Sequence, residues 1–376
     1  MNVLQVVTLV TPDGAYGGPL RVAFNQAREI REHGHCVTIV GACRGYSEPP
    51  ETVDDTAVHL SKARRVIPFI GISGISSPAA IMWIFRHRRQ IDVVHVHLGR
   101  DLVTMPAAML ALLLKKRLVI QTHGMISKSD KAVAPLLDRV LTRPVLRRAD
   151  VVLYLSSRER EEIMEIESAI DGVHLPNGVP ETEETADPRD GLLDVLFLAR
   201  LHERKRPTLF VEAAAELLAE GNAARFSMVG PDGGEAAHVC GAINRLGDYS
   251  SAIVWEGPLA PDETGERMVR ASIYVLPSID EPFPMSVLEA MAVGLPVVVT
   301  ESCGLADVVR QSGSGIVVDH SKQSLVDAMR TLLDDPGLRV EMGTAARKTA
   351  REQFSMQAVG DALVAIYSLQ ADRQHS

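Results

Sequence analysis

The stretch IYVLPSIDEPFPMSVLEAMAVGLPVVVT, residues 273–300, decides the fold of this 376-residue chain. It opens with the apolar run Ile273–Leu276 and closes with a second such run, Val297–Thr300. Between them a polar loop leads into a segment with helical spacing that starts near Met285 and ends before Gly294. A strand, a helix and a strand in this order place the two strands in parallel in one sheet. The sequence therefore predicts an α/β fold.

Short apolar runs alternate with helix-period segments along the rest of the chain. Helical spacing of apolar residues predicts helices over Pro19–His33 and Thr208–Ala219. The further predicted strands are Val3–Val10, Val37–Val40, Asp92–His97, Arg117–Gln121, Val151–Leu155, Val195–Leu198, Phe226–Val229 and Ile253–Glu256. Runs that are apolar throughout are typical of parallel sheets with helices on both faces.

A change of composition divides the chain near residues 176–191. Turn-forming residues in Pro176–Pro180 are followed by an acidic, core-poor segment with Pro188 and Gly191, which indicates a linker that acts as a hinge. We therefore predict two Rossmann-like domains, over 1–175 and 176–355. Open α/β sheets bind ligands beyond the carboxyl ends of their strands, so two such domains facing each other are expected to form a cleft.

Charge and cysteine usage exclude some classes of function. Residues 1–180 hold 22 Lys and Arg against 18 Asp and Glu, whereas the remainder holds 17 against 30. The acidic second half disfavours nucleic-acid binding. The basic first half fits an anionic acceptor or membrane surface, or equally a solvated surface. The four cysteines form no C-x-x-C motif and are expected to be reduced and buried in a cytosolic protein, and we predict no metal site.

No segment of the sequence has the pattern of a signal or transmembrane helix. The apolar run at Val3–Val10 is too short, and Ile67–Phe85 is interrupted by glycine, serine and proline. The arginines at 64–65 and 86–89 flank that second stretch. Two interpretations stay open for it: a surface that touches an anionic membrane, or a buried amphipathic helix with a basic cap.

The loop at 278–289 carries the strongest chemical signal. Pro284 suits the first position of a helix, and the free amides of Met285, Ser286 and Val287 would then favour an anion such as a diphosphate. Glu289 in the same helix can accept hydrogen bonds from a ribose diol. Glu281 can reach the hydroxyls of a sugar beyond the phosphates. If the two glutamates had no function, one would reflect the preference for acidic residues near the start of a helix and the other would be a solvated side chain.

A cationic segment follows the first predicted strand of the second domain. Arg200 and Lys205 both lie on the carboxyl side of the predicted sheet. Two cations there can stabilise the charge on a departing nucleoside diphosphate without a metal ion. Taken alone, the segment would more often be a solvated basic loop.

Together these motifs resemble family 4 of the retaining glycosyltransferases (glycosyl transferases group 1), which have the GT-B fold of two Rossmann-like domains with a cleft between them. The Arg-x4-Lys pair and the Glu-x7-Glu motif match that family in order and spacing. Four further stretches agree with it over nearly the whole chain. These are Gly17–Ala23, Asp92–His97, Thr122–Gly124 and Pro176–Val179.

The resemblance implies a role for each matching residue. Gly17 and Gly18 would allow close approach of the backbone to the donor. Arg200 and Lys205 would hold the diphosphate and Glu289 the ribose. Glu281, His123 and the backbone of Phe283, Pro284, Met285 and Ser286 would contact the donor sugar, while His97 could equally be a core histidine. The pocket for the base would involve Gly230 and Leu259. The helix after Ser355, over residues 356–376, would cross back to the first domain.

Three departures from the family leave the particular sugar undetermined. Pro284 stands where many relatives have Gly, Pro180 replaces a frequent Asp, and the segment before Gly17 is longer.

The predicted reaction is transfer of a hexose from a nucleotide diphosphate sugar to a hydroxyl with retention, without metal or cofactor, in polysaccharide, glycolipid or other glycoconjugate synthesis. The acceptor would be a sugar, a lipid-linked hydroxyl or a small molecule. We expect a cytoplasmic location, with peripheral contact at the inner face of the plasma membrane as an alternative. A sugar-nucleotide 2-epimerase and a non-catalytic nucleotide-sugar-binding protein are the rival functions.

Overall fold

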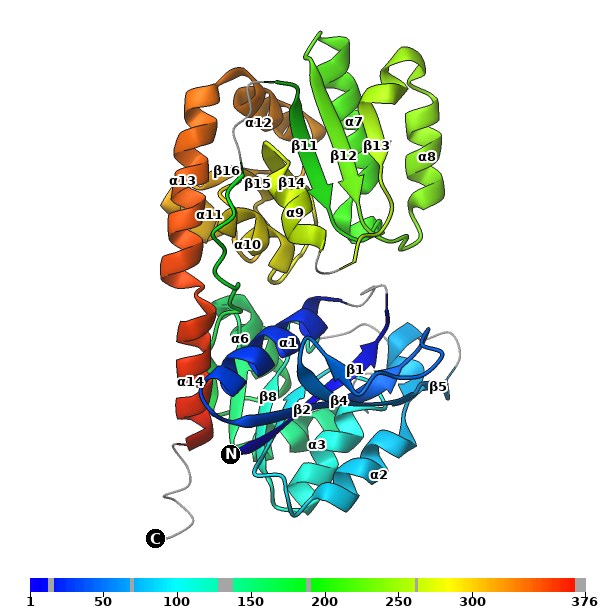
Figure 1. Ribbon diagram of the computed structural model, residues 1–376, viewed down its shortest axis with the longest axis vertical. Helices are drawn as coiled ribbons and strands as arrows, with labels where there is room; N and C mark the ends of the chain where they lie inside the picture. Colours follow the sequence, from blue (N-terminus) through cyan, green and yellow to red (C-terminus); the bar gives the residue numbers. More distant parts are fainter. Residues whose placement is uncertain (13–16, 68–70, 128–137, 187–190, 261–262, 369–376) are drawn as a thin grey trace. The chain divides into compact units, whose positions relative to one another are not determined.

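The computed structural model describes residues 1–12, 17–67, 71–127, 138–186, 191–260 and 263–368 (Figure 1). The chain divides into two compact units. Unit 1 comprises Met1–Gly178 together with the C-terminal segment from Met356, and unit 2 comprises Val179–Ser355. Each is an α/β unit built on a parallel sheet, as the sequence predicts.

Unit 1 is built on an eight-stranded sheet in the order β10-β9-β8-β7-β1-β2-β4-β3. All neighbours are parallel except β3 and β4. The strands are β1 (Asn2–Val10), β2 (Cys36–Cys43), β3 (Thr52–Val53), β4 (Thr56–Lys62), β7 (Val93–His97), β8 (Arg117–Gln121), β9 (Val151–Tyr154) and β10 (Gly172–His174). A small antiparallel pair joins β5 (Arg64–Arg65) to β6 (Ile75–Ser76).

Helices cover both faces of this sheet, because successive side chains of the central strands point to opposite faces and both sets are apolar. Val3 and Val7 of β1 belong to the core that packs on α1 and α14, whereas Leu4 and Val6 belong to the core beneath α2, α3, α5 and α6. The helices are α1 (Gly17–Glu32), η1 (Gly71–Gly74), α2 (Pro78–His87), α3 (Thr104–Leu113), η2 (Asp138–Thr142), α5 (Arg143–Arg148), α6 (Ser157–Ile166) and α14 (Met356–Ser368).

Unit 2 is built on a six-stranded sheet in the order β13-β12-β11-β14-β15-β16, with every pair parallel. Phe210 of α7 packs against Phe197 of β11 and Phe226 of β12 in its core. The strands are β11 (Leu193–Leu198), β12 (Ala224–Val229), β13 (Ile253–Trp255), β14 (Ile273–Leu276), β15 (Val297–Thr300) and β16 (Gly315–Val318). The helices are η3 (Glu203–Lys205), α7 (Pro207–Ala219), α8 (Ala236–Asn244), η4 (Gly247–Ala252), α9 (Glu263–Val269), α10 (Met285–Ala292), α11 (Ala306–Ser312), α12 (Lys322–Asp334) and α13 (Pro336–Gln353).

The last described helix, α14, belongs to unit 1 although it follows unit 2 in the chain. Val359, Leu363 and Ile366 lie on its buried face, in the core that also contains α1 residues. His33 Nε2 lies 2.8 Å from Asp361 Oδ1, and Arg117 donates to the backbone carbonyl of Ile366 at 2.7 Å. The helix therefore completes the hydrophobic core of unit 1.

The structure corrects several expectations. The first helix begins at Gly17 instead of Pro19, so Gly17 and Gly18 lie inside α1. Cys36 and Cys240 are exposed, and only Cys43 and Cys303 are buried. Residues 13–16 of the long segment before Gly17 lie outside the described residues. No helix in the described ranges is both long and apolar enough to cross a bilayer.

Candidate active site

The strand order of unit 2 marks where a ligand is expected to bind. The order along the sheet reverses between β11 and β14, so the loops after these two strands leave the sheet side by side in opposite directions. Such a switch point forms a crevice beyond the carboxyl ends of the strands. Arg200 and Lys205 follow β11, and Glu281 follows β14. The switch point therefore brings together residues that are about eighty positions apart in the sequence.

Lys205 and Glu281 form an ion pair at this switch point. Lys205 Nζ lies 2.5 Å from Glu281 Oε2, and the two side chains are 21% and 17% exposed. The amide of Ile279 donates to the carbonyl of Arg204 at 2.8 Å, and the Arg204 guanidinium donates to the carbonyl of Asp280. The two loops are thus cross-linked, which fixes the lysine and the carboxylate beside each other.

The loop that carries Glu281 is shaped by unusual backbone geometry. Asp280 has φ of +50°, a left-handed conformation, and its amide donates to Ser302 Oγ at 3.0 Å. The amide of Gly304 donates to the carbonyl of Glu281 at 2.8 Å. A Cβ on Gly304 would lie 1.6 Å from the carbonyl oxygen of Pro282, so only glycine fits there. Ser302 and Gly304 are therefore positioning residues that the sequence did not reveal.

The start of α10 differs in detail from the prediction. Pro284 is the N-cap, with extended dihedral angles, and the helix begins at Met285. The amide of Val287 donates to the carbonyl of Pro284 at 3.1 Å, so it is not free for a ligand as predicted. The amides of Met285 and Ser286 donate to no described residue. These two amides, at the positive end of the helix dipole, are the groups suited to an anion.

Tyr274, inside β14, contacts the first turn of α10 through its hydroxyl. Its hydroxyl contacts the carbonyl oxygen of Leu198 at 3.0 Å and Ser286 Oγ at 2.7 Å. Burial raises the pKa of the Tyr274 phenol, although the hydrogen bond to Ser286 acts in the opposite sense. The side chain therefore stays neutral and ties the end of β11 to the first turn of α10.

The other predicted donor residues of unit 2 lie on neighbouring loops. Arg200 lies against the loop after β12, where a Cβ on Gly233 would lie 2.7 Å from Arg200 Cδ. The amide of Gly230 donates to the carbonyl of Gly257 at 2.9 Å, two residues before the partly exposed Leu259. In and beside α10, Glu289 is half-buried, and the ring of Phe283 packs edge-on against Phe354 at 6.0 Å.

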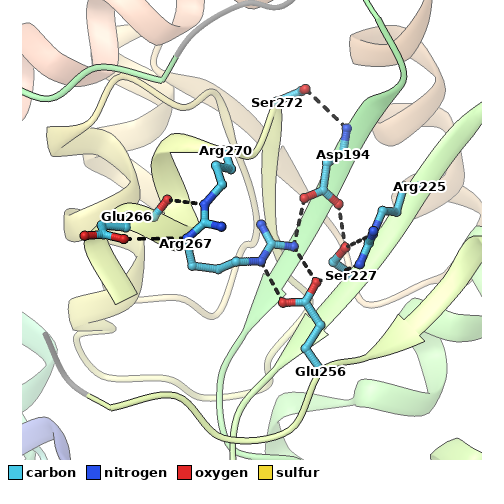
Figure 2. Close-up of polar contacts among 8 residues, drawn as sticks. All are labelled: Asp194, Arg225, Ser227, Glu256, Glu266, Arg267, Arg270 and Ser272. Carbon is cyan, nitrogen blue, oxygen red and sulfur yellow. Dashed lines mark hydrogen bonds and ion pairs between the residues drawn. The ribbon is translucent and has the colours of Figure 1, made fainter. Parts of the chain in front are cut away.

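A partly buried charged cluster joins the strands that lead to this site, and no motif in the sequence predicts it (Figure 2). Arg267 of α9, only 7% exposed, lies 2.8 Å from Asp194 Oδ2 of β11 and 2.8 Å from Glu256 Oε2 after β13. Ser227 of β12 donates to Asp194 at 2.6 Å. Burial alone would raise the pKa of Glu256, but Arg267 and Arg225 bring it below its ordinary value. The cluster ties α9 to three adjacent strands.

Unit 1 has its own switch point between β1 and β7. Gly17 and Gly18 open the helix after β1, His97 ends β7, and His123 follows β8. A Cβ on Gly18 would meet no atom within 4 Å, so the packing of this unit does not require glycine there. Glycine in a helix costs about 1 kcal/mol relative to alanine, which favours a role outside packing.

His97 and His123 contact each other directly. His97 Nδ1 lies 2.7 Å from His123 Nε2, and the two rings are nearly parallel. His95 stacks on the other side of His97, and its Nδ1 lies 2.7 Å from the hydroxyl of Tyr367 in α14. We call His95, His97, His123 and Tyr367 the histidine column. Burial lowers the pKa of His95 and of His123 to about 3, and it lowers that of His97 well below the ordinary value.

Glu159, 2% exposed, holds the loop that carries His123. Its carboxylate accepts hydrogen bonds from Thr122 Oγ1 and from the amides of Gly124 and Leu155. His123 adopts a left-handed conformation with φ of +51°, and Gly124 has φ of +70°. Because its neighbours on both sides are bonded to one buried carboxylate, His123 is held in this uncommon conformation.

Comparison with known proteins identifies the family of this chain. Residues 180–349 match the family described as glycosyl transferases group 1, and residues 17–178 match the glycosyl transferase 4-like domain. The two matches together span most of both units. The chain belongs to this family of GT-B glycosyltransferases.

Relatives of this glycosyltransferase include several named enzymes. It is 30% identical to the D-inositol 3-phosphate glycosyltransferase of Kineococcus radiotolerans over 59% of this chain and 58% of that protein. It is 27% identical to the alpha-D-kanosaminyltransferase of Streptomyces kanamyceticus over 80% of this chain and 84% of that one. The D-inositol 3-phosphate glycosyltransferase of Corynebacterium aurimucosum is 25% identical over 94% and 91% of the two chains.

Solved structures share its fold. A sucrose-phosphate synthase from Thermosynechococcus elongatus aligns with a TM-score of 0.80 and 17% identity over 99% of both chains. The HepE protein of Anabaena, in complex with UDP and glucose, aligns with a TM-score of 0.78 and 17% identity over 98% of this glycosyltransferase and 100% of that protein.

Proposed function

We propose that this glycosyltransferase moves a hexose from a nucleotide diphosphate sugar to a hydroxyl acceptor, with retention of the anomeric configuration. The observation that carries the proposal is the Lys205–Glu281 ion pair at the switch point of unit 2, together with the amides of Met285 and Ser286, which donate to no residue in the described ranges. A cation, two aligned amides and a carboxylate at one sheet edge suit a diphosphate linked to a polyol.

The ion pair gives each partner a role. Unpaired, Glu281 would repel a diphosphate, but in contact with Lys205 its charge is balanced. When the donor binds, Lys205 and Arg200 neutralise the phosphates and the two amides donate hydrogen bonds to phosphate oxygens. Glu281 accepts hydrogen bonds from sugar hydroxyls. Glu289 holds the ribose diol, and the backbone near Gly230 and Leu259 lines the base.

The chemical step needs charge stabilisation at the leaving group. The acceptor oxygen attacks the anomeric carbon on the face that the diphosphate leaves. The bond from that carbon to the phosphate oxygen breaks, and the departing phosphate takes the proton of the acceptor hydroxyl. Arg200 and Lys205 stabilise the charge on the nucleoside diphosphate in place of a metal ion. In unit 1, the residues that we propose for donor contact are Gly17, Gly18 and His123.

The names of relatives support a sugar-nucleotide donor. HepE forms a complex with UDP and glucose, and two relatives are named as a D-inositol 3-phosphate glycosyltransferase and an alpha-D-kanosaminyltransferase. We propose a sugar, a lipid-linked hydroxyl or a small molecule as acceptor here, in polysaccharide or glycoconjugate synthesis.

The test is incubation with a panel of UDP-, GDP- and ADP-hexoses, with slow hydrolysis as the readout and calorimetry for the matching nucleoside diphosphate. Lys205→Met is expected to weaken nucleoside diphosphate binding by about ten- to a hundred-fold, since a charge-assisted hydrogen bond is lost. Lys322→Met is the matched control, because Lys322 also pairs with a glutamate, Glu216, at 2.7 Å in unit 2. It should leave binding unchanged.

Three results would overturn the proposal. Equal affinity of Lys205→Met and wild type for the nucleoside diphosphate would contradict the proposed donor site. An isomerised sugar nucleotide without transfer would indicate an epimerase. An inverted linkage in the product, determined by NMR, would exclude retention.

We also propose that α2 contacts an anionic membrane. Ala80 and Ile84 are buried, but Met82 and Phe85 are 49% and 44% exposed and lie on one face with the exposed Arg86, and the exposed Arg89 follows the helix. The buried-helix and membrane interpretations thus apply to opposite faces of one helix. Sedimentation with vesicles of phosphatidylcholine alone or with phosphatidylserine tests this. Phe85→Gln should reduce binding to the anionic vesicles, whereas Leu113→Gln, exposed at 76% on α3, should not.

A further inference from the structure

The contact between His97 and His123 can hold only one proton when both rings are neutral. His97 Nδ1 and His123 Nε2 are 2.7 Å apart, so one nitrogen donates and the other accepts. The low pKa values of both rings keep them neutral at physiological pH. Two arrangements therefore exist, which differ in the nitrogen that carries the proton.

The surroundings of His97 decide between the two arrangements. His97 is 1% exposed, and its Nε2 is buried without a hydrogen-bond partner in the described ranges. If His123 donated, His97 would have to carry its own proton on Nε2, as a buried N–H without an acceptor. If His97 donates, that position holds only a lone pair. Orphaned buried N–H groups are rarer in proteins than under-satisfied acceptors, so donation by His97 is favoured.

Donation by His97 fixes the state of His123. Its Nε2 accepts the proton of His97, so its own proton must lie on Nδ1. His123 keeps part of its surface exposed, whereas His97 does not, and the Nδ1–H group can therefore reach solvent or a ligand. The buried carboxylate of Glu159 holds the loop on both sides of His123 and so preserves the contact.

We propose that His97 is a positioning residue that holds His123 as the neutral Nδ1–H tautomer, so that His123 offers the donor sugar a hydrogen-bond donor and does not act as a base. The role toward the sugar rests on the proposed function. With its Nε2 occupied by His97 and its Nδ1 protonated, His123 has no free lone pair to take the proton of an acceptor. That proton is then left to the departing phosphate, as the proposed mechanism requires.

The tautomer can be measured without any donor. A long-range ¹H–¹⁵N spectrum of the full-length protein with ¹⁵N-labelled histidine distinguishes protonated from bare ring nitrogens. The signals of His123 are assigned by their loss in His123→Asn. We expect a protonated Nδ1 and a bare Nε2 at neutral pH. A proton on Nε2, or on both nitrogens, would overturn the proposal.

Two variants of His97 separate positioning from packing. His97→Asn places an amide donor near the position of Nδ1 and should retain most of the activity. His97→Leu keeps volume but removes the donor, and is expected to lower kcat at least about ten-fold without changing the affinity for UDP, which lacks a sugar. His95→Leu, two residues before His97 on the same strand, is the control for burial and should not change kcat. Equal loss in His97→Asn and His97→Leu would contradict a positioning role.

These results are independent of the proposed function. If no sugar nucleotide in the panel is hydrolysed, the proposed function fails while the tautomer remains measurable. If hydrolysis of UDP-glucose or another panel member is normal but His123 carries its proton on Nε2, only the present proposal fails.

Discussion

The polar cluster around Arg267 in unit 2 is charged and paired, whereas the histidine column of unit 1 consists of neutral rings. Arg267 lies between Asp194 and Glu256, so a cation faces two carboxylates (Figure 2). In the histidine column, burial removes the charge instead, by lowering the pKa of each ring. A paired cluster depends on every member, because loss of one leaves an uncompensated charge. A neutral column depends on proton positions and is therefore sensitive to pH.

The largest expected effect is the loss of Arg267. Arg267→Met leaves Asp194 without its cation and Glu256 with only the more exposed Arg225, and should lower the free energy of unfolding of unit 2 by about 3 kcal/mol. Urea unfolding followed by the fluorescence of Trp255, in a Trp83→Phe background, measures this. Arg270→Met is the control in the same helix region, because Arg270 pairs with Glu266 at 3.7 Å on the exposed surface and should change stability by less than about 1 kcal/mol. Similar losses for both variants would show that the cluster is not a stabilising unit.

The second prediction concerns the pH dependence of unit 1. His95 and His123 have folded pKa values of about 3, whereas in the unfolded chain they bind protons below about pH 6.5. The unfolded state therefore binds more protons between these values, and stability falls as the pH is lowered from 6.5. Each ring should contribute about 1.4 kcal/mol per pH unit.

Two buried carboxylates act in the opposite sense. Burial raises the pKa of Asp101 and Glu159, so protonation of these groups favours the folded state. The contribution of His95 to the pH dependence of stability is therefore obtained by comparing that dependence in wild type and in His95→Asn. Hydrogen exchange of peptides that cover β7 and β8, at pH 6.5 and 5.5, should show a smaller acid effect in the variant. An identical acid effect in both proteins would mean that His95 is not buried as a neutral ring.

The smallest expected effect is the loss of one hydroxyl in each unit. Tyr367→Phe leaves His95 Nδ1 without its partner, and Tyr274→Phe removes the contacts to Leu198 and Ser286. Each should cost about 1–1.5 kcal/mol in its own unit, the usual range for a neutral hydrogen bond. Urea unfolding of the two variants provides the comparison. A loss from Tyr367→Phe as large as that from Arg267→Met would show that the column is as tightly coupled as the charged cluster.

Much of the fold could be predicted from local patterns. The ten predicted strands are present, five in each unit, with ends that differ by a few residues, because uninterrupted apolar runs leave little choice of structure. Six strands were not predicted, namely the two-residue strands β3, β5 and β6 and the longer strands β4, β10 and β16. The alternating pattern of Thr56–Lys62 and the short, half-exposed Gly172–His174 lack such runs.

The sequence predicts candidate residues for a donor site but not the contacts between them. Arg200, Lys205, Glu281 and the amides before Glu289 were assigned from two separate motifs. That Lys205 and Glu281 bond to each other depends on the adjacency of β11 and β14, which no local spacing encodes. Arg267 lies in a segment of mixed charges typical of a surface helix, and its partners are 73 and 11 positions away. The sequence does not decide whether His97 is a core or a functional residue, and the structure shows that it contacts His123.

The course of the chain has a consequence for biosynthesis. Unit 1 is the first to emerge from the ribosome, yet Val359, Leu363 and Tyr367 of α14 are buried in its core. Synthesis of unit 1 is thus finished only after all of unit 2 has been made, so unit 2 can reach its native state first. Until then the surface of α1 that packs against α14 stays uncovered. Premature termination near residue 355 would yield a protein with an intact unit 2 and an incomplete unit 1.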